Sequence, residues 1–147
     1  MKNVLLLLIT VSLMGLSSCN KSKSDSKDVA SVDSDEWKEM DSFHIIMADA
    51  FHPYKDSANL APVKKLAEEM AVEANKWAFS PLPERVNNDD VKQSLYKLKE
   101  DTRALADLIK SGADDSSVGA SLNSLHDSFH GIMEAWHKGE EKNEHSH

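Results

Sequence analysis

Four segments of this chain carry apolar residues at steps of three and four, and this periodicity constrains the fold more than any other feature. Such spacing places apolar side chains along one side of an α-helix. No segment alternates with a period of two, as a half-buried strand would, and no Asn-Gly or Asp-Gly hairpin signal is present. The sequence therefore predicts an all-α domain whose helices bury one stripe each.

Proline residues delimit the first two predicted helices. The first spans residues 35–52 and ends before Pro53, because proline interrupts the hydrogen bonds of a helix. The second begins at Pro62, since proline is favoured in the first turn, and runs to about Phe79. Their predicted buried stripes are Met40, His44, Met47 and Phe51 in the first helix, and Val63, Leu66, Met70, Ala74 and Trp77 in the second.

Cap-forming residues delimit the other two helices. The third begins near Asp89 or Asp90 and ends before Gly112, where a left-handed cap is expected. The fourth begins within the Asp and Ser run of residues 114–117 and ends by Gly139. Their predicted buried stripes are Val91, Leu95, Leu98, Thr102, Leu105 and Ile109 in the third helix, and Val118, Leu122, Leu125, Phe129, Ile132 and Trp136 in the fourth.

Helices of similar length joined by short or moderate loops favour an up-down-up-down antiparallel four-helix bundle. The seven-residue repeat of each stripe predicts shallow, left-handed crossings. We expect this bundle to span residues 35–139, which is long enough for one small domain with one core. The polar residues 140–147 are predicted to form a disordered tail.

The N-terminus predicts export from the cytoplasm. A basic start at Lys2 precedes an apolar run over residues 4–16 that is too short to span a bilayer comfortably, so it indicates a signal peptide. The residues Leu16-Ser17-Ser18-Cys19 resemble the lipobox of bacterial lipoproteins. The resemblance implies a signal peptide over residues 1–18 and acylation of Cys19, for example with palmitate. An ordinary signal peptide with an incidental cysteine is the alternative.

Such a lipid anchor predicts a location in the bacterial cell envelope, at the outer membrane, on its periplasmic or surface side. Residues 19–34 are rich in Ser, Lys and Asp and predict a flexible tether between the anchor and the bundle. Removal of residues 1–18 takes away one basic residue and changes the net charge from −8 to −9. This acidity argues against nucleic acid as a partner and favours cations.

A row of nitrogen and sulfur ligands accompanies the apolar stripe of the fourth predicted helix: His126, His130, Met133 and His137. In an antiparallel bundle the first and fourth helices are neighbours, and placing Met47 opposite His130 brings Phe51 or His52 close to His126. Imidazole and thioether groups suit copper, whereas imidazole alone suits zinc or nickel.

Two histidines four residues apart, such as His126 and His130, can direct two nitrogens to one ion. The predicted metal ligands are therefore His126, His130, His52, His44 and Met47. A carboxylate such as Asp127 or Asp49 would orient one of the rings from behind.

The helix pattern over residues 35–139 resembles the four-helix bundles of the cytochrome c-prime and soluble b-type cytochrome class. The b-type members of that class hold haem iron between a Met of the first helix and a His near the end of the fourth. The resemblance implies haem b as an alternative ligand of the bundle, with Met40, His137 and Met133 as the alternative haem ligands. The Cys-x-x-Cys-His motif for covalent haem is absent.

A third interpretation needs no ligand at all. Half-buried histidines often pack their rings while their nitrogens stay hydrated, and Met is an ordinary core residue. The chain would then be a helical scaffold that binds another envelope protein. The sequence carries no phosphate-binding loop, nucleophile elbow, di-iron Glu-x-x-His pair or His-Glu-x-x-His motif, so we do not expect an enzyme.

Overall fold

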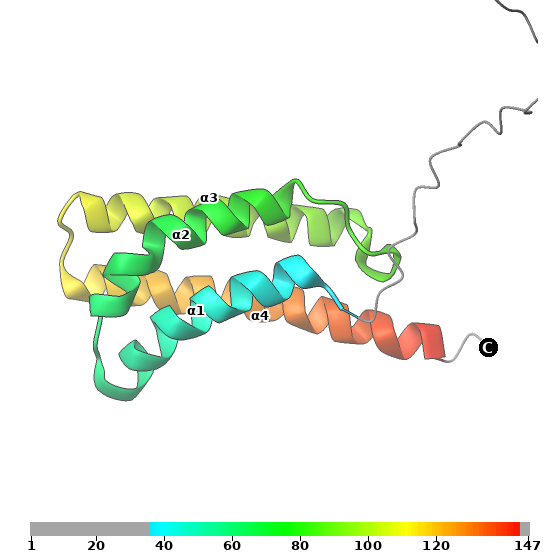
Figure 1. Ribbon diagram of the computed structural model, residues 1–147, viewed down its shortest axis with the longest axis horizontal. Coiled ribbons are helices and arrows are strands. Elements are labelled where there is room, and N and C mark those ends of the chain that lie inside the picture. Colours follow the sequence, from blue (N-terminus) through cyan, green and yellow to red (C-terminus); the bar gives the residue numbers. More distant parts are fainter. Residues whose placement is uncertain (1–35, 145–147) are drawn as a thin grey trace, which may run out of the picture. The chain divides into compact units, whose positions relative to one another are not determined.

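The computed structural model describes residues 36–144, and the burial of side chains up to Gly139. This part of the chain contains four α-helices, one short 3₁₀ helix and no β-strand, as predicted (Figure 1). The elements are α1 (Lys38–Ser57), α2 (Ala61–Ala78), η1 (Glu84–Val86), α3 (Asp89–Lys110) and α4 (Asp115–Glu144). The predicted signal peptide, the lipidation site Cys19 and the tether lie outside the described residues.

The helices form a four-helix bundle in which α2 packs against α1 and α3, while α4 packs against α3 and α1 (Figure 1). Trp37, immediately before α1, packs on Trp136 near the end of α4, with ring centroids 5.5 Å apart. Phe51 near the end of α1 stacks on His126 in the first half of α4. These contacts pair the beginning of one helix with the end of the other, so α1 and α4 run antiparallel.

The predicted stripes of α2, α3 and α4 form the core, except that Leu66 and Ile109 are only partly buried. The stripe predicted for α1 is wrong at one position. His44 is exposed, whereas its neighbour Phe43 is completely buried and packs on Phe129 with centroids 5.3 Å apart. A phenyl ring has more apolar surface to remove from water than imidazole, so the helix turns Phe43 inward.

The end of α1 also differs from the prediction, because the helix continues through Pro53 to Ser57. The carbonyl of Pro53 accepts hydrogen bonds from Ser57 Oγ at 2.9 Å and from the backbone N–H of Asn59 at 3.1 Å. Ala58 adopts the left-handed conformation with φ 53° and closes the helix. Packing of the extra turn on the core through Tyr54 compensates for the hydrogen bond that proline removes.

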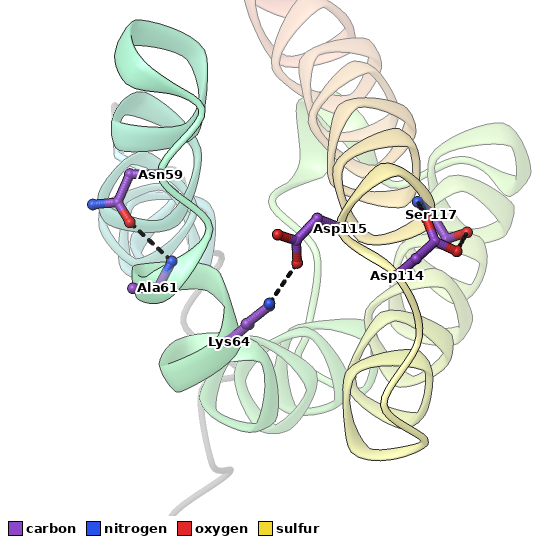
Figure 2. A network of polar contacts seen from close by, with 6 residues as sticks. All are labelled: Asn59, Ala61, Lys64, Asp114, Asp115 and Ser117. Atoms are coloured by element: carbon purple, nitrogen blue, oxygen red, sulfur yellow. Dashed lines mark hydrogen bonds and ion pairs between the residues drawn. The ribbon is translucent and has the colours of Figure 1, made fainter.

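The structure confirms the predicted caps at Gly112 and Asp114 and adds an N-cap at Asn88, which the sequence pattern did not indicate. Asn88 Oδ1 accepts a hydrogen bond from the N–H of Val91 at 3.0 Å, and Gly112 has φ +75° after the end of α3. Asp114 accepts hydrogen bonds from the N–H and the hydroxyl of Ser117 at the beginning of α4 (Figure 2). These bonds lower the pKa of Asp114.

One end of the bundle is connected by a polar contact between helices that are not consecutive. Lys64 in the first turn of α2 forms an ion pair with Asp115 in the first turn of α4, at 2.6 Å (Figure 2). The side chain of Asn59 accepts a hydrogen bond from the N–H of Ala61 where α2 begins. Both charged groups of the ion pair are substantially exposed, so this contact orients the helices more than it stabilises them.

At the other end, α4 extends to Glu144, beyond its predicted end at Gly139. Gly139 is buried against η1, where a Cβ would lie 3.1 Å from the carbonyl oxygen of Arg85. The Arg85 guanidinium lies over the Trp136 ring, 4.0 Å from its centroid. Gly139 therefore permits a close approach within the helix instead of ending it. None of the described helices is long and apolar enough to cross a membrane.

Candidate functional site

The most distinctive polar contact of the structure joins His126 and His130 on α4. They are four positions apart in the helix, so both side chains leave it on the same face. Their Nε2 atoms lie 3.1 Å apart, and the ring centroids are separated by 4.4 Å. His126 is half-buried and His130 is exposed, so the pair lies at the boundary between the core and solvent.

The ring of His126 is held in place by the neighbouring helix. Phe51 of α1 stacks on it almost in parallel, with centroids 3.6 Å apart and an interplanar angle of 7°. On the other side of the imidazole, Nδ1 lies 3.8 Å from Asp127 Oδ1. This distance is too long for a direct hydrogen bond, so the carboxylate acts on the ring through its charge. The stack and the carboxylate together direct Nε2 toward His130.

The environment of His126 favours its neutral form. Partial burial is the largest cause that lowers its pKa below the ordinary histidine value of 6.5, and the adjacent His130 is the second. Asp127 raises the pKa and partly opposes them, while His52 lowers it slightly further. A histidine that is neutral at physiological pH has an unprotonated nitrogen available to bind a cation.

The distance between the two Nε2 atoms agrees with two chemical states. Nitrogens bound to one zinc ion at roughly 2.0–2.1 Å, with ordinary tetrahedral or square angles, lie about 2.9–3.4 Å apart. An N–H···N hydrogen bond between two neutral rings falls in the same range. The two nitrogens are equally far apart in both states, and to bind an ion the pair must move the proton of one Nε2 to Nδ1 and turn both lone pairs toward the ion.

The other predicted ligands lie at different depths. His52 is exposed near the end of α1, beside Phe51, and acts electrostatically on His126. His44 is exposed and lies against Phe129, with centroids 5.2 Å apart. Met47 is buried in the core, with 1% of its surface exposed. Among the described residues, no three His, Cys, Asp or Glu side chains converge closely enough to hold a metal ion.

The residues that a haem would require are divided between the core and the surface. Met40 is buried and Met133 partly buried, whereas His137 is exposed. The core that contains Met40 also contains three indole rings. The Trp37 ring packs edge-on against Trp77, with centroids 5.1 Å apart, and its centroid lies 5.5 Å from that of Trp136. A haem bound there would have to displace these indole rings.

A second surface feature, which the periodicity did not indicate, lies between α2 and α3. It is an open groove of about 470 Å³, lined by Ala71, Val72, Asn75, Lys99, Glu100, Arg103, Ala104 and Asp107. Exposed Phe79 and Tyr96 pack edge-to-face, and the Lys99 ammonium lies over both rings. Two basic and two acidic residues line the groove, so its charges select no particular ligand.

Comparisons with models of known protein families, with curated protein sequences and with solved structures find no significant match to this chain.

Proposed function

We propose that this chain is a lipid-anchored protein of the bacterial cell envelope whose helical bundle binds a transition-metal ion through His126 and His130. The observation that carries this proposal is the pair of Nε2 atoms 3.1 Å apart, which matches the separation of two nitrogens on one ion. The lowered pKa of His126 supports it, because protons then compete less with the metal.

The supporting residues have unequal roles in this proposal. His52 is exposed and acts on His126 through its charge, but it does not join the pair to form a third ligand. His44 lies on the same helix as His52, and Met47 lies in the core. With the Met47 thioether buried, the exposed ligands are nitrogens, which favours zinc or copper(II) over copper(I). The metal would be buffered, sensed or transferred, and not used for catalysis.

The sequence before the bundle supports the envelope location. The lipobox-like residues Leu16-Ser17-Ser18-Cys19 would attach the chain to a membrane, and residues 19–34 would separate the bundle from it. For the bundle itself we propose the full up-down-up-down order of the four helices. It agrees with the antiparallel contacts between α1 and α4.

Two alternatives compete with the metal proposal. A haem-b electron carrier would use Met40, Met133 or His137, but the core that contains Met40 also contains the packed indole rings of Trp37, Trp77 and Trp136. A ligand-free scaffold would keep His126 and His130 as a hydrogen-bonded pair, and the exposed Phe79 and Tyr96 could then contact a protein partner.

The test is isothermal titration of zinc and copper(II) into protein in which His145 and His147 are replaced by alanine, so that the terminal histidines bind no metal. We expect one site that is lost in His126→Ala and in His130→Ala but kept in the matched control His137→Ala, an exposed histidine of the same helix. A metal at 100 times its dissociation constant should stabilise the fold by about 2.7 kcal/mol.

Unchanged metal binding in the His126→Ala, His130→Ala double variant would contradict the assignment. An absorption spectrum of the same samples separates haem from metal, because haem alone gives an intense Soret band. Protein that binds neither metal nor haem would leave the scaffold interpretation.

A further inference from the structure

The described residues of one chain supply only part of a metal coordination shell. The two imidazoles account for two positions, whereas zinc in a closed structural site has four ligands. The described residues contain no group of three His, Cys, Asp or Glu that could hold an ion. If His126 and His130 bind a metal, as proposed above, the remaining positions are open to a donor from outside the chain.

The open positions are accessible to such a donor. His130 is exposed, and the neighbouring Asp127 side chain is 86% exposed, so the pair faces solvent on one side. Phe51 covers only one face of the His126 ring, from the α1 side. A ligand that approaches along the surface of α4 therefore reaches the ion without disturbing the core.

We propose that a second copy of this chain supplies the missing ligands, so that one metal ion joins two His126–His130 pairs. A two-fold axis through the ion would make the two pairs equivalent, and two-fold symmetry is the commonest arrangement of identical subunits. Four imidazole nitrogens then complete a tetrahedral site. This inference rests on the proposed function and extends it to metal-dependent assembly.

The charges near the site make the metal necessary for this assembly. The chain carries a net charge of −8, and Asp127 places a carboxylate directly beside each pair. Two copies that approach through this surface repel each other when no cation lies between them. A divalent ion bound by neutral imidazoles offsets the charges of the two Asp127 carboxylates beside it, and its bonds to both pairs hold the copies together, so we expect the metal-free protein to be monomeric.

The experiment is sedimentation velocity of the His145→Ala, His147→Ala protein during titration with zinc. We expect monomers in chelator, dimers at one zinc ion per two chains, and a return to monomers when chelator is added. Excess zinc should also dissociate the dimer, because each chain then binds its own ion. His130→Ala should abolish the dimer, and His137→Ala should leave it intact.

The outcomes distinguish this inference from the proposed function. A monomer that binds one zinc ion per chain through His126 and His130 would overturn the dimer and leave the metal site in place. Absence of zinc binding would overturn the dimer, and absence of both zinc and copper(II) binding would overturn the proposed function as well. A dimer that persists in chelator, or that survives His130→Ala, would show that association does not depend on this ion and would also overturn the inference.

Discussion

Replacement of Gly119 by alanine tests the contact that holds the end of α1 against α4. Gly119 is buried, and a Cβ at this position would lie 2.5 Å from Tyr54 Oη and 2.8 Å from Tyr54 Cζ. Asn123 Nδ2 donates a hydrogen bond to the same hydroxyl at 3.3 Å. The added methyl group must therefore displace the Tyr54 ring. The same pairing of helices places Phe51 on His126, so the proposed metal site depends on it as well.

Two terms of opposite sign determine the expected effect. Alanine is favoured over glycine in a helix interior by about 0.8–1 kcal/mol. Overpacking at a helix contact costs about 1–3 kcal/mol. Gly119→Ala should therefore lower the free energy of unfolding by about 0–2 kcal/mol. Gly131 is the matched control, because it is exposed on the same helix and its Cβ would meet no atom within 4 Å. Gly131→Ala should raise the free energy of unfolding by about 1 kcal/mol.

Urea and thermal unfolding of the two variants should differ by about 1–3 kcal/mol, and each kcal/mol corresponds to about 4 °C in Tm for a domain of this size. In a Tyr54→Ala background the obstacle is absent, so Gly119→Ala should become as stabilising as Gly131→Ala. Equal stabilisation by both alanines in the wild-type background would refute the contact. Persistence of the Gly119→Ala cost without Tyr54 would show that another residue causes it.

Two further predictions concern pH and helix capping. In chelator, the native state binds fewer protons than the unfolded state, because burial and His130 lower the pKa of His126. The stability advantage of wild type over His126→Gln should therefore be complete above pH 6.5 and decrease on acidification. A difference in urea unfolding that does not change with pH would contradict this expectation. Asn88→Ala should lower the free energy of unfolding by about 1 kcal/mol, because it removes the oxygen that accepts the hydrogen bond from the N–H of Val91. Asn88→Asp keeps an oxygen acceptor and should not lower it. Equal losses of stability in thermal unfolding of the two variants would contradict the cap.

The sequence predicts most of the fold because its periodicity and caps are local signals. The buried stripes of α2, α3 and α4 and the caps at Gly112 and Asp114 depend only on residues within a few positions of one another. The errors occur where distant contacts decide. The last turn of α1 persists beyond Pro53 because Tyr54 packs on α4, and Gly139 remains helical because η1 approaches it closely. Neither contact can be predicted from the residues that neighbour Pro53 or Gly139 in the sequence.

In the candidate site, too, some positions follow from local sequence and others depend on distant contacts. The four-residue spacing of His126 and His130 places them on one face of any α-helix, so their proximity follows from the sequence. The burial of Met47 also agrees with its place in the predicted stripe. The position of His44 does not follow, because each helical residue is rotated about 100° from the next and a residue beside the buried stripe can turn either way. Phe43 takes the buried position, and His44 is left exposed. Only the packing of α1 on α4 determines the choice.

The two histidines of the pair differ in a way that suits reversible binding. Phe51 and partial burial fix the His126 ring and lower its pKa, so one ligand is oriented and neutral before an ion arrives. His130 is exposed, so it can adjust to the ion and to a donor from outside. A fixed ligand reduces the entropy lost on binding, whereas a mobile one permits exchange. In the proposed metal site, this asymmetry would make Phe51 a determinant of metal affinity although it donates no electron pair to the ion.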